Sequence, residues 1–349
     1  MTKLMTTMCD LLEKGEDLVL CTVLSHRGST PRTAGTKMIV RSDGRIIATV
    51  GGGCVEGDVM MTAAEVFESR SALIKSFDLT GVNVDGMDLV CGGQLDILVE
   101  YLTADADTVA VFRGLAEAQR DGKKCYLAAD LGLVNDPPSK VNRCLIREDG
   151  ATLGNMVPPP QLMETLAGWT GKERYPVLLT FGDRNYVVEP SYVPGTVYLF
   201  GAGHVSQQVA PLANLVDFHT VVLDDRAEFA NRSRFPGADE VRSVRSFQNC
   251  FSDLDIDENS YVVIVTRGHV HDKTVLEQAL KTNARYIGMI GSRHKTKKIF
   301  NELLAQGFSD ADLERVYSPI GTKIGAETPE EIGISIVGEL ILARFKHKS

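Results

Sequence analysis

Two cysteines in this sequence lie beside runs of glycine, where a thiol could act as a nucleophile or as a ligand for a soft metal. Cys54 follows Gly52 and Gly53 and opens a stretch in which apolar residues recur at helical spacing. A thiol at a helix N-terminus has a lowered pKa, which favours the reactive thiolate. Cys91 precedes a second pair of glycines and then a strand-like run. The alternative for both is packing in a tight turn, and only for Cys91 does it weigh as much as chemistry.

The other cysteines lie in helix-like or strand-like patterns, so we interpret them as packing residues. The sequence has no Cys-x-x-Cys pair, and its total of 7 cysteines is odd. This arrangement rules out a closed disulfide framework and a zinc ribbon of the usual spacing, and it is typical of free thiols in a reducing cytoplasm. The packing residues are Cys9, Cys21, Cys125, Cys144 and Cys250.

A glycine-rich turn in the second half could bind a phosphate. Gly201 and Gly203 follow a short apolar run, and His204 begins a helix-like pattern. This is the arrangement of the dinucleotide-binding fingerprint, although Ser206 replaces its third glycine. Asp224 ends the next predicted strand, where an acid can bind a ribose hydroxyl. These features predict a nucleotide or phosphate site, and the alternative is a doubly wound domain whose turn binds nothing.

Two further clusters follow predicted strands in the same half. The first holds His269, His271 and Asp272. No further histidine or acid is placed to complete a metal site, so we expect no metal and predict a helix cap by Asp272 and one histidine that contacts a ligand. The second cluster, Ser292 and Arg293, opens a later helix. It predicts a second anion site, with a solvated basic turn as the alternative.

The elements that must position these residues have a different pattern in the two halves. Residues 191–349 alternate short apolar strands with helices, which predicts a Rossmann-like, doubly wound parallel sheet. Residues 1–190 are rich in strands and turns and predict a mixed α/β N-terminal domain, with prolines marking the boundary. No internal repeat is apparent. Strands are predicted at 18–25, 37–41, 45–50, 73–78, 95–102, 196–200, 219–223, 261–265 and 286–290.

The composition excludes several classes of protein. Of 349 residues, 44% are hydrophobic, enough apolar surface for folded domains rather than disorder. The formal net charge of −9 argues against binding to a nucleic-acid backbone, which needs clustered Lys and Arg. No apolar run reaches the roughly 18 residues of a membrane span, and the first residues lack the apolar core of a signal peptide. We therefore expect a cytoplasmic protein with no membrane or nucleic-acid partner.

The motifs of both halves, taken in order, resemble those of the xanthine dehydrogenase accessory proteins of the XdhC/CoxI type. Their joint occurrence over most of the chain is far more specific than any one of them. Residues 105–190 contain none of them. The matching stretches are 28–32 (GSTPR), 51–56 (GGGCVE), 91–93 (CGG), 200–205 (FGAGHV), 224–226 (DDR), 266–272 (TRGHVHD), 286–295 (YIGMIGSRHK), 319–321 (PIG) and 328–332 (TPEEI).

The resemblance implies a maturation chaperone of molybdenum hydroxylases rather than a turnover enzyme. Such a protein holds the molybdenum cofactor (molybdopterin) during sulfuration and inserts it into a xanthine dehydrogenase-type apo-enzyme. A cysteine desulfurase would supply the sulfur, and the family is generally homodimeric. Cys54 would contact molybdenum or relay sulfur, while the glycine turns and the helix start at Arg293 would bind the pterin phosphate or a nucleotide.

Two other functions stay open at this point. The first is an NAD(P)-dependent oxidoreductase, suggested by Gly201, Gly203 and Asp224, but no convincing acid/base set for hydride transfer accompanies them beyond His269 or His271. The second is a non-catalytic scaffold between the desulfurase and the target enzyme, in which the glycine motifs are only structural.

Overall fold

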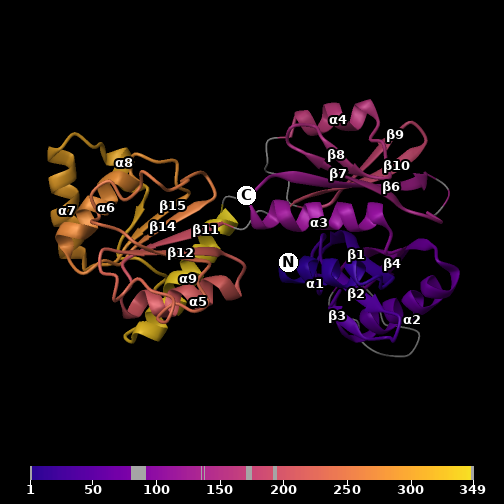
Figure 1. Cartoon of the computed structure of the whole chain (residues 1–349), viewed down its shortest axis with the longest axis horizontal. Coiled ribbons are helices and arrows are strands. Elements are labelled where there is room, and N and C mark those ends of the chain that lie inside the picture. Colours follow the sequence, from indigo (N-terminus) through magenta and orange to yellow (C-terminus); the bar gives the residue numbers. More distant parts are fainter. Residues whose placement is uncertain are drawn as a thin grey trace. The chain divides into compact units, whose positions relative to one another are not determined.

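The computed structural model describes residues 2–79, 92–134, 136, 138–169, 175–191 and 195–346. The chain divides into two compact units, residues 1–193 and 194–349 (Figure 1). Each unit has hydrophobic clusters drawn from its own residues alone.

The N-terminal unit begins with an antiparallel five-stranded sheet of order β3-β2-β1-β5-β4. Strand β3 is shorter than the predicted 45–50, because Ala48 takes a left-handed conformation (φ 65°) that ends it. The elements are α1 (Thr2–Glu13), β1 (Leu18–Arg27), β2 (Lys37–Arg41), β3 (Ile46–Ala48), α2 (Gly53–Ser69), β4 (Ala72–Asp78) and β5 (Gln94–Leu102).

A second antiparallel sheet, of order β8-β7-β6-β10-β9, follows in the same unit. Its strands succeed one another along the chain and across the sheet as those of the first sheet do, and each half has one helix before its first strand and one after its third. The unit is therefore an internal repeat that the sequence does not reveal. The elements are α3 (Ala106–Arg120), β6 (Cys125–Leu133), β7 (Asn142–Arg147), β8 (Thr152–Gly154), α4 (Pro160–Ala167), β9 (Val177–Phe181) and β10 (Arg184–Pro190).

Four buried charged residues occupy equivalent positions in the two repeats. Lys37 pairs with the fifth residue of β1, and Arg143 pairs with the fifth residue of β6. Glu100 and Glu189 pair with the third residues of the same two strands. The ion pairs cross between the repeats: Lys37 Nζ lies 2.5 Å from Glu189 Oε2, and Arg143 donates to Glu100. The exchange is reciprocal, as at a two-fold interface.

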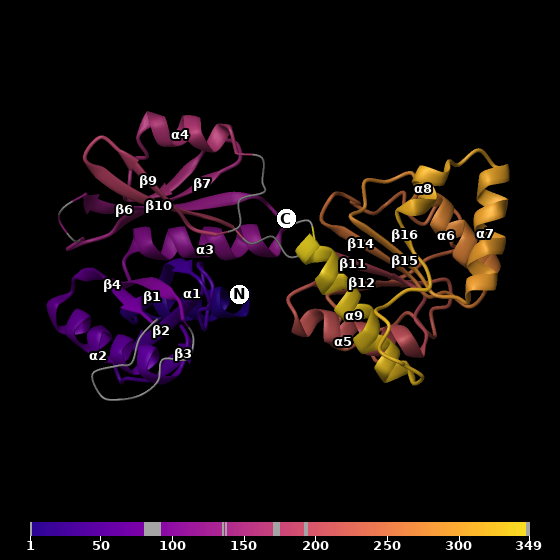
Figure 2. The same ribbon diagram turned by 180° about the vertical axis from the view of Figure 1, so that it is seen from behind.

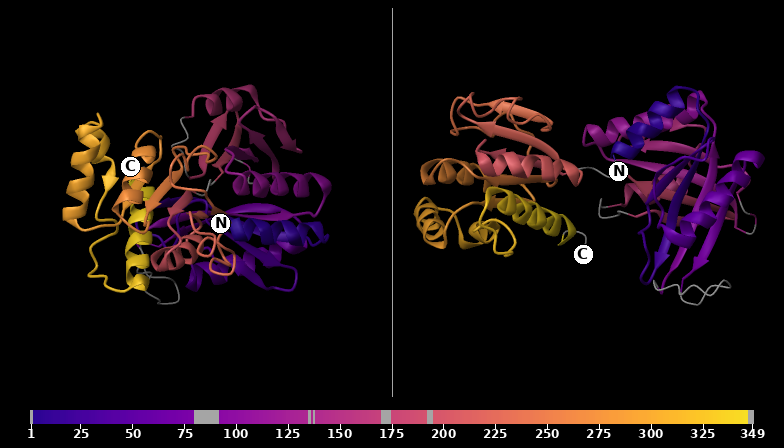
Figure 3. Two further views of the ribbon diagram at one scale, coloured as in Figure 1. Left: turned by 60° about the vertical axis from the view of Figure 1, so that its left-hand side comes forward. Right: turned by 90° about the horizontal axis from the view of Figure 1, so that it is seen from below.

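Helices α1 and α3 form the core between the two sheets. They lie side by side, and one hydrophobic cluster joins them to both sheets (Figures 1 and 3). The side chain of Asp105 begins α3 by accepting from the Thr108 amide at 2.8 Å. Helix α2 packs on the first sheet and α4 on the second, through separate clusters. The first residues of α2 are thus fixed beside the ends of β1 and β3.

The C-terminal unit has a six-stranded parallel sheet of order β13-β12-β11-β14-β15-β16, which confirms the predicted Rossmann-like fold. Helices cover both faces (Figure 2). The strand order reverses between β11 and β14, where ligands bind in such sheets. The elements are β11 (Thr196–Phe200), α5 (His204–Leu215), β12 (His219–Asp224), β13 (Glu240–Ser243), β14 (Ser260–Ile264), α6 (His269–Ala279), β15 (Tyr286–Met289), α7 (Arg293–Ala305), α8 (Asp310–Glu314), β16 (Val316–Tyr317) and α9 (Pro329–Lys346).

Small residues bring α9 close to its neighbours. A Cβ atom on Gly333 would lie 2.9 Å from Gln208 Cβ in α5, so only glycine fits there without displacement. Ser335 Oγ donates to the Thr322 carbonyl at 2.7 Å. These contacts place α9 against α5 and against the segment that follows β16. No described helix is long and apolar enough to cross a membrane.

Candidate functional site

Three glycine-containing segments of the N-terminal unit meet at one place. A Cβ atom on Gly93 would lie 2.5 Å from the carbonyl oxygen of Ser29, and one on Gly28 would lie 3.0 Å from the Gly92 carbonyl oxygen. The loop after β1 therefore packs directly on the segment before β5. A Cβ atom on Gly51 would lie 3.4 Å from Pro31 Cβ, which brings the same loop to the start of α2. The sequence motifs at 28–32, 51–54 and 92–93 thus form one cluster.

Cys54 is exposed at the edge of this cluster, in the first turn of α2. Gly52 precedes the helix with φ 76° and Gly53 begins it with φ 59°, conformations that glycine adopts readily. No side chain caps the helix start, and no atom lies within 4 Å of a Cβ built on either glycine. The thiol and the first amide groups of α2 are thus open to a ligand. Cys91, the other predicted thiol, lies outside the described residues.

The approach to the turn is fixed by its own hydrogen bonds. The Gly51 amide donates to Thr49 Oγ1 at 3.1 Å, and the Thr49 hydroxyl donates to the Glu56 carboxylate. Glu56 therefore holds the strand-to-helix connection and is not free to act on a ligand.

The five cysteines predicted to be packing residues are buried. Burial raises the pKa of Cys9 and of Cys144 to about 11 and the pKa of Cys250 to about 12. These thiols are protonated at neutral pH, so Cys54 is the one exposed cysteine in the part of the chain that the structure describes.

In the C-terminal unit the glycine turn lies between β11 and α5. Gly201 has φ 107°, and a Cβ there would lie 2.5 Å from the Val265 carbonyl oxygen, so glycine permits the close approach of β11 to β14. Gly203 precedes α5 without a side-chain cap, and His204 is exposed beside it. Buried Ser206 donates to the Gly201 carbonyl. That bond gives the serine a role in closing the turn at the place of the third glycine.

Asp224 supports the turn instead of facing a ligand. Its carboxylate is 1% exposed and accepts from the Ala202 amide at 2.7 Å and from Arg226 Nε at 2.8 Å. Burial acts to raise the pKa of Asp224, but the hydrogen bonds from Arg226 and Ala202 outweigh it, so the pKa lies below its usual range. Asp225 binds Arg267 at 2.8 Å. Neither carboxylate is presented freely for a ribose hydroxyl.

Asp272 joins the two loops that follow β14 and β15. It is fully buried, accepts from the Thr266 amide at 3.2 Å, and is paired with Lys295 in α7. His269 is exposed at the start of α6. His271 lies against the ring of Phe247, 5.4 Å between ring centres. Among the described residues, no three His, Cys, Asp or Glu side chains are grouped to hold a metal ion.

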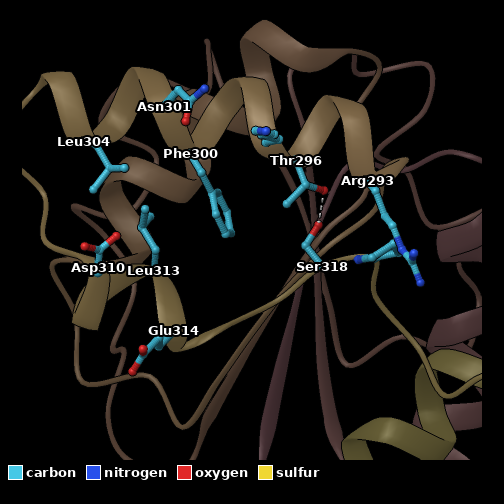
Figure 4. Close-up of a pocket in the computed structure, with 11 residues that line it drawn as sticks. Arg293, Thr296, Phe300, Asn301, Leu304, Asp310, Leu313, Glu314 and Ser318 are labelled. Atoms are coloured by element: carbon cyan, nitrogen blue, oxygen red, sulfur yellow. Dashed lines mark hydrogen bonds between the residues drawn. The ribbon is translucent and has the colours of Figure 1, made fainter.

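At the start of α7, Ser292 caps the helix by accepting from the Lys295 amide at 3.3 Å, and Arg293 is exposed. Arg293 also lines a groove between α7 and α8 (Figure 4). Thus the predicted residues of this unit all lie at the carboxyl ends of parallel strands. Sequence reasoning missed the groove, because its walls come from two helices and from the segment after β16.

The comparison with known proteins follows this division of the molecule. The family model described as "XdhC and CoxI family" matches residues 11–78, and the one described as "XdhC Rossmann domain" matches residues 197–340. The chain belongs to the XdhC/CoxI family. The first match contains the Cys54 turn, and the second contains the whole parallel sheet.

Relatives of full length extend this result. A Bacillus subtilis protein whose name describes it as one of the probable subunits of xanthine dehydrogenase is 28% identical, with 97% of each chain covered. The molybdenum cofactor insertion chaperone PaoD of Escherichia coli is 23% identical over 96% of this chain and 86% of its own. A crystal structure titled as a xanthine dehydrogenase from Bacillus halodurans superimposes with a TM-score of 0.78 at 25% identity, covering 97% of this chain and 96% of that one. This likeness includes residues 105–190, which carry no sequence motif.

Proposed function

We propose that this protein is a molybdenum cofactor insertion chaperone, which holds the cofactor while its terminal sulfur is installed and then passes it to a xanthine dehydrogenase-type enzyme. Membership of the XdhC/CoxI family and the relative named as such a chaperone support this function. The observation that carries it is the exposed Cys54 at the meeting point of three glycine segments.

The residues of this turn fit the cofactor chemically. The cofactor supplies a soft metal centre with sulfur ligands and a phosphate group when it is bound. A thiolate is the protein ligand that suits such a metal, and uncapped helix amides suit oxygen anions. Cys54 would hold the metal end or relay sulfur, and the first amides of α2 would orient it. Gly52 and Gly53 keep side chains out of the approach.

The proposed partners are a cysteine desulfurase as sulfur donor, an apo molybdenum hydroxylase as recipient and a second copy of this chain. The protein itself turns over no substrate in this proposal. We do not propose an oxidoreductase, because Asp224 is engaged by Ala202 and Arg226.

The test is the pterin content of the protein purified from a host that makes the cofactor, measured by fluorescence after oxidation, together with activation of apo xanthine dehydrogenase. We expect Cys54→Ala to lose most of the bound pterin or of the activation. Glu68→Ala, at the far end of α2, is the matched control and is expected to retain both. If Cys54→Ala matches the wild type in both assays, the thiol has no role. If no pterin binds but activation persists, the protein is a scaffold.

A further inference from the structure

The groove between α7 and α8 has the dimensions of a small-molecule site. Its volume is about 780 Å³, and its walls are α7, α8 and the segment after β16 (Figure 4). Pockets for small ligands commonly measure roughly 300–1,000 Å³. It opens at the carboxyl ends of β15 and β16, which is the ligand-binding edge of a parallel sheet.

One wall is a single stripe of α7 that changes from basic to aromatic. Arg293, Lys297 and Phe300 lie on this stripe at helical spacing, and the ring of Phe300 projects into the groove (Figure 4). At about 1.5 Å of rise per residue, Arg293 and Phe300 are about 10 Å apart along the helix. Within the described parts of the chain, neither Arg293 nor Lys297 has an ion pair, so both cations are free to bind an anion.

The opposite wall is acidic around an apolar centre. Asp310 and Glu314 stand one turn apart on α8, with buried Leu313 between them. Both carboxylates are exposed and, in the part of the chain that is described, carry no ion pair. They are acceptors for ring N–H and amino groups. The groove therefore has an anion-binding end, an aromatic middle and an end that accepts hydrogen bonds.

Hydrogen bonds between the elements hold the floor of the groove in place. Thr296 Oγ1 in α7 lies 2.8 Å from Ser318 Oγ, and Ser318 also donates to the Met289 carbonyl at 3.0 Å. Helix α7, β15 and the segment after β16 are thus joined directly. A ligand would meet a floor that is already formed, so binding would order few side chains.

We propose that this groove binds a phosphorylated amino-heterocycle, with its phosphate at Arg293 and Lys297, its ring against Phe300 and its ring N–H groups at Glu314. Nucleoside monophosphates and pterin phosphates share this chemistry. The site is separate from the Cys54 turn and does not rest on the proposed function.

The test is isothermal titration calorimetry of the full-length protein with CMP, GMP and 6-hydroxymethylpterin phosphate, each compared with its dephosphorylated form. We expect saturable binding of at least one phosphorylated probe, and the preferred probe distinguishes a nucleotide from a pterin. Arg293→Ala should weaken that binding about 10-fold or more, because it removes a charge-assisted hydrogen bond, and should change binding of the dephosphorylated form less than about 2-fold. Lys298→Ala, on α7 but outside the groove, is the matched control.

Two further variants test the ring end. Phe300→Leu keeps an apolar side chain but removes the aromatic face, and Glu314→Gln removes the charged acceptor. Both should weaken the phosphorylated and dephosphorylated probes equally. The proposal is wrong if no probe binds saturably at about 1 mM, or if binding is unchanged in Arg293→Ala. Failure here together with normal pterin content in the Cys54 assay leaves the proposed function standing.

Discussion

At the scale of single residues, burial separates Cys54 from the other described thiols. We expect iodoacetamide at neutral pH to label Cys54 faster than the buried cysteines, because burial both blocks access and holds the pKa of Cys9 and Cys144 at about 11. Peptide mass spectrometry of the native protein measures the order of labelling. Unfolding in urea is the control and should equalise the rates. Equal labelling of Cys54 and Cys144 in the native protein would contradict the structure.

Asp224 predicts a pH-dependent contribution to stability. Its pKa is lowered in the folded state, so its contribution is present above the pKa of the unfolded chain and is lost as pH falls through the folded pKa. Asp224→Asn should lower the free energy of unfolding by about 2 kcal/mol at pH 7, the scale of a charged hydrogen bond, and by progressively less below about pH 4. Urea unfolding from pH 7 to pH 3 measures the difference. A constant difference over this range would contradict the assignment.

The candidate residues were predictable to different extents. Cys54 was found because glycines before a helix leave a recognisable pattern, and its exposure agrees with that pattern. The engagement of Asp224 was not predictable, because the sequence Asp224-Asp225-Arg226 does not show which carboxylate the guanidinium binds. His271 is a similar case, since its contact with Phe247 joins residues that are distant in the sequence.

At the scale of elements, the buried ion pairs decide how the two sheets of the N-terminal unit fit together. The side chains of Arg143 and Glu100 are 7% and 4% exposed. Arg143→Met should cost about 3–5 kcal/mol of folding free energy, because it leaves a buried carboxylate unpaired. The double variant with Glu100→Leu should recover much of this loss, since no unpaired charge remains. Chemical denaturation of both variants measures the coupling.

Lys37→Met provides the comparison for that experiment. Its partner Glu189 is 18% exposed and keeps some access to water, so the loss should be smaller than that of Arg143→Met. Equal losses would mean that burial of the partner carboxylate does not set the cost.

The two sheets of elements were predicted unequally. The parallel sheet of the C-terminal unit was predictable, because strands buried on both faces read as continuous apolar runs between helices. The repeat in the N-terminal unit was not, because the two halves share positions rather than residues. Lysine in one half corresponds to arginine in the other, and the glycine turn has no glycine counterpart.

At the scale of the whole molecule, two units with separate hydrophobic clusters predict two unfolding events. Differential scanning calorimetry should resolve two transitions. Arg143→Met should lower the midpoint of one by about 4 °C or more, and Asp224→Asn should lower the other. A single transition shifted by both variants would show that the units unfold together.

The repeat within the N-terminal unit also bears on how many ligands one chain holds. Where Gly52 and Gly53 begin α2, the second half begins α4 with Pro159 and Pro160. Proline has no amide hydrogen, so that helix start offers fewer donors to an anion and has no thiol beside it. Two copies of one scaffold thus divided the work: one kept an open binding turn and the other became its support. The expected stoichiometry at this turn is one cofactor per chain.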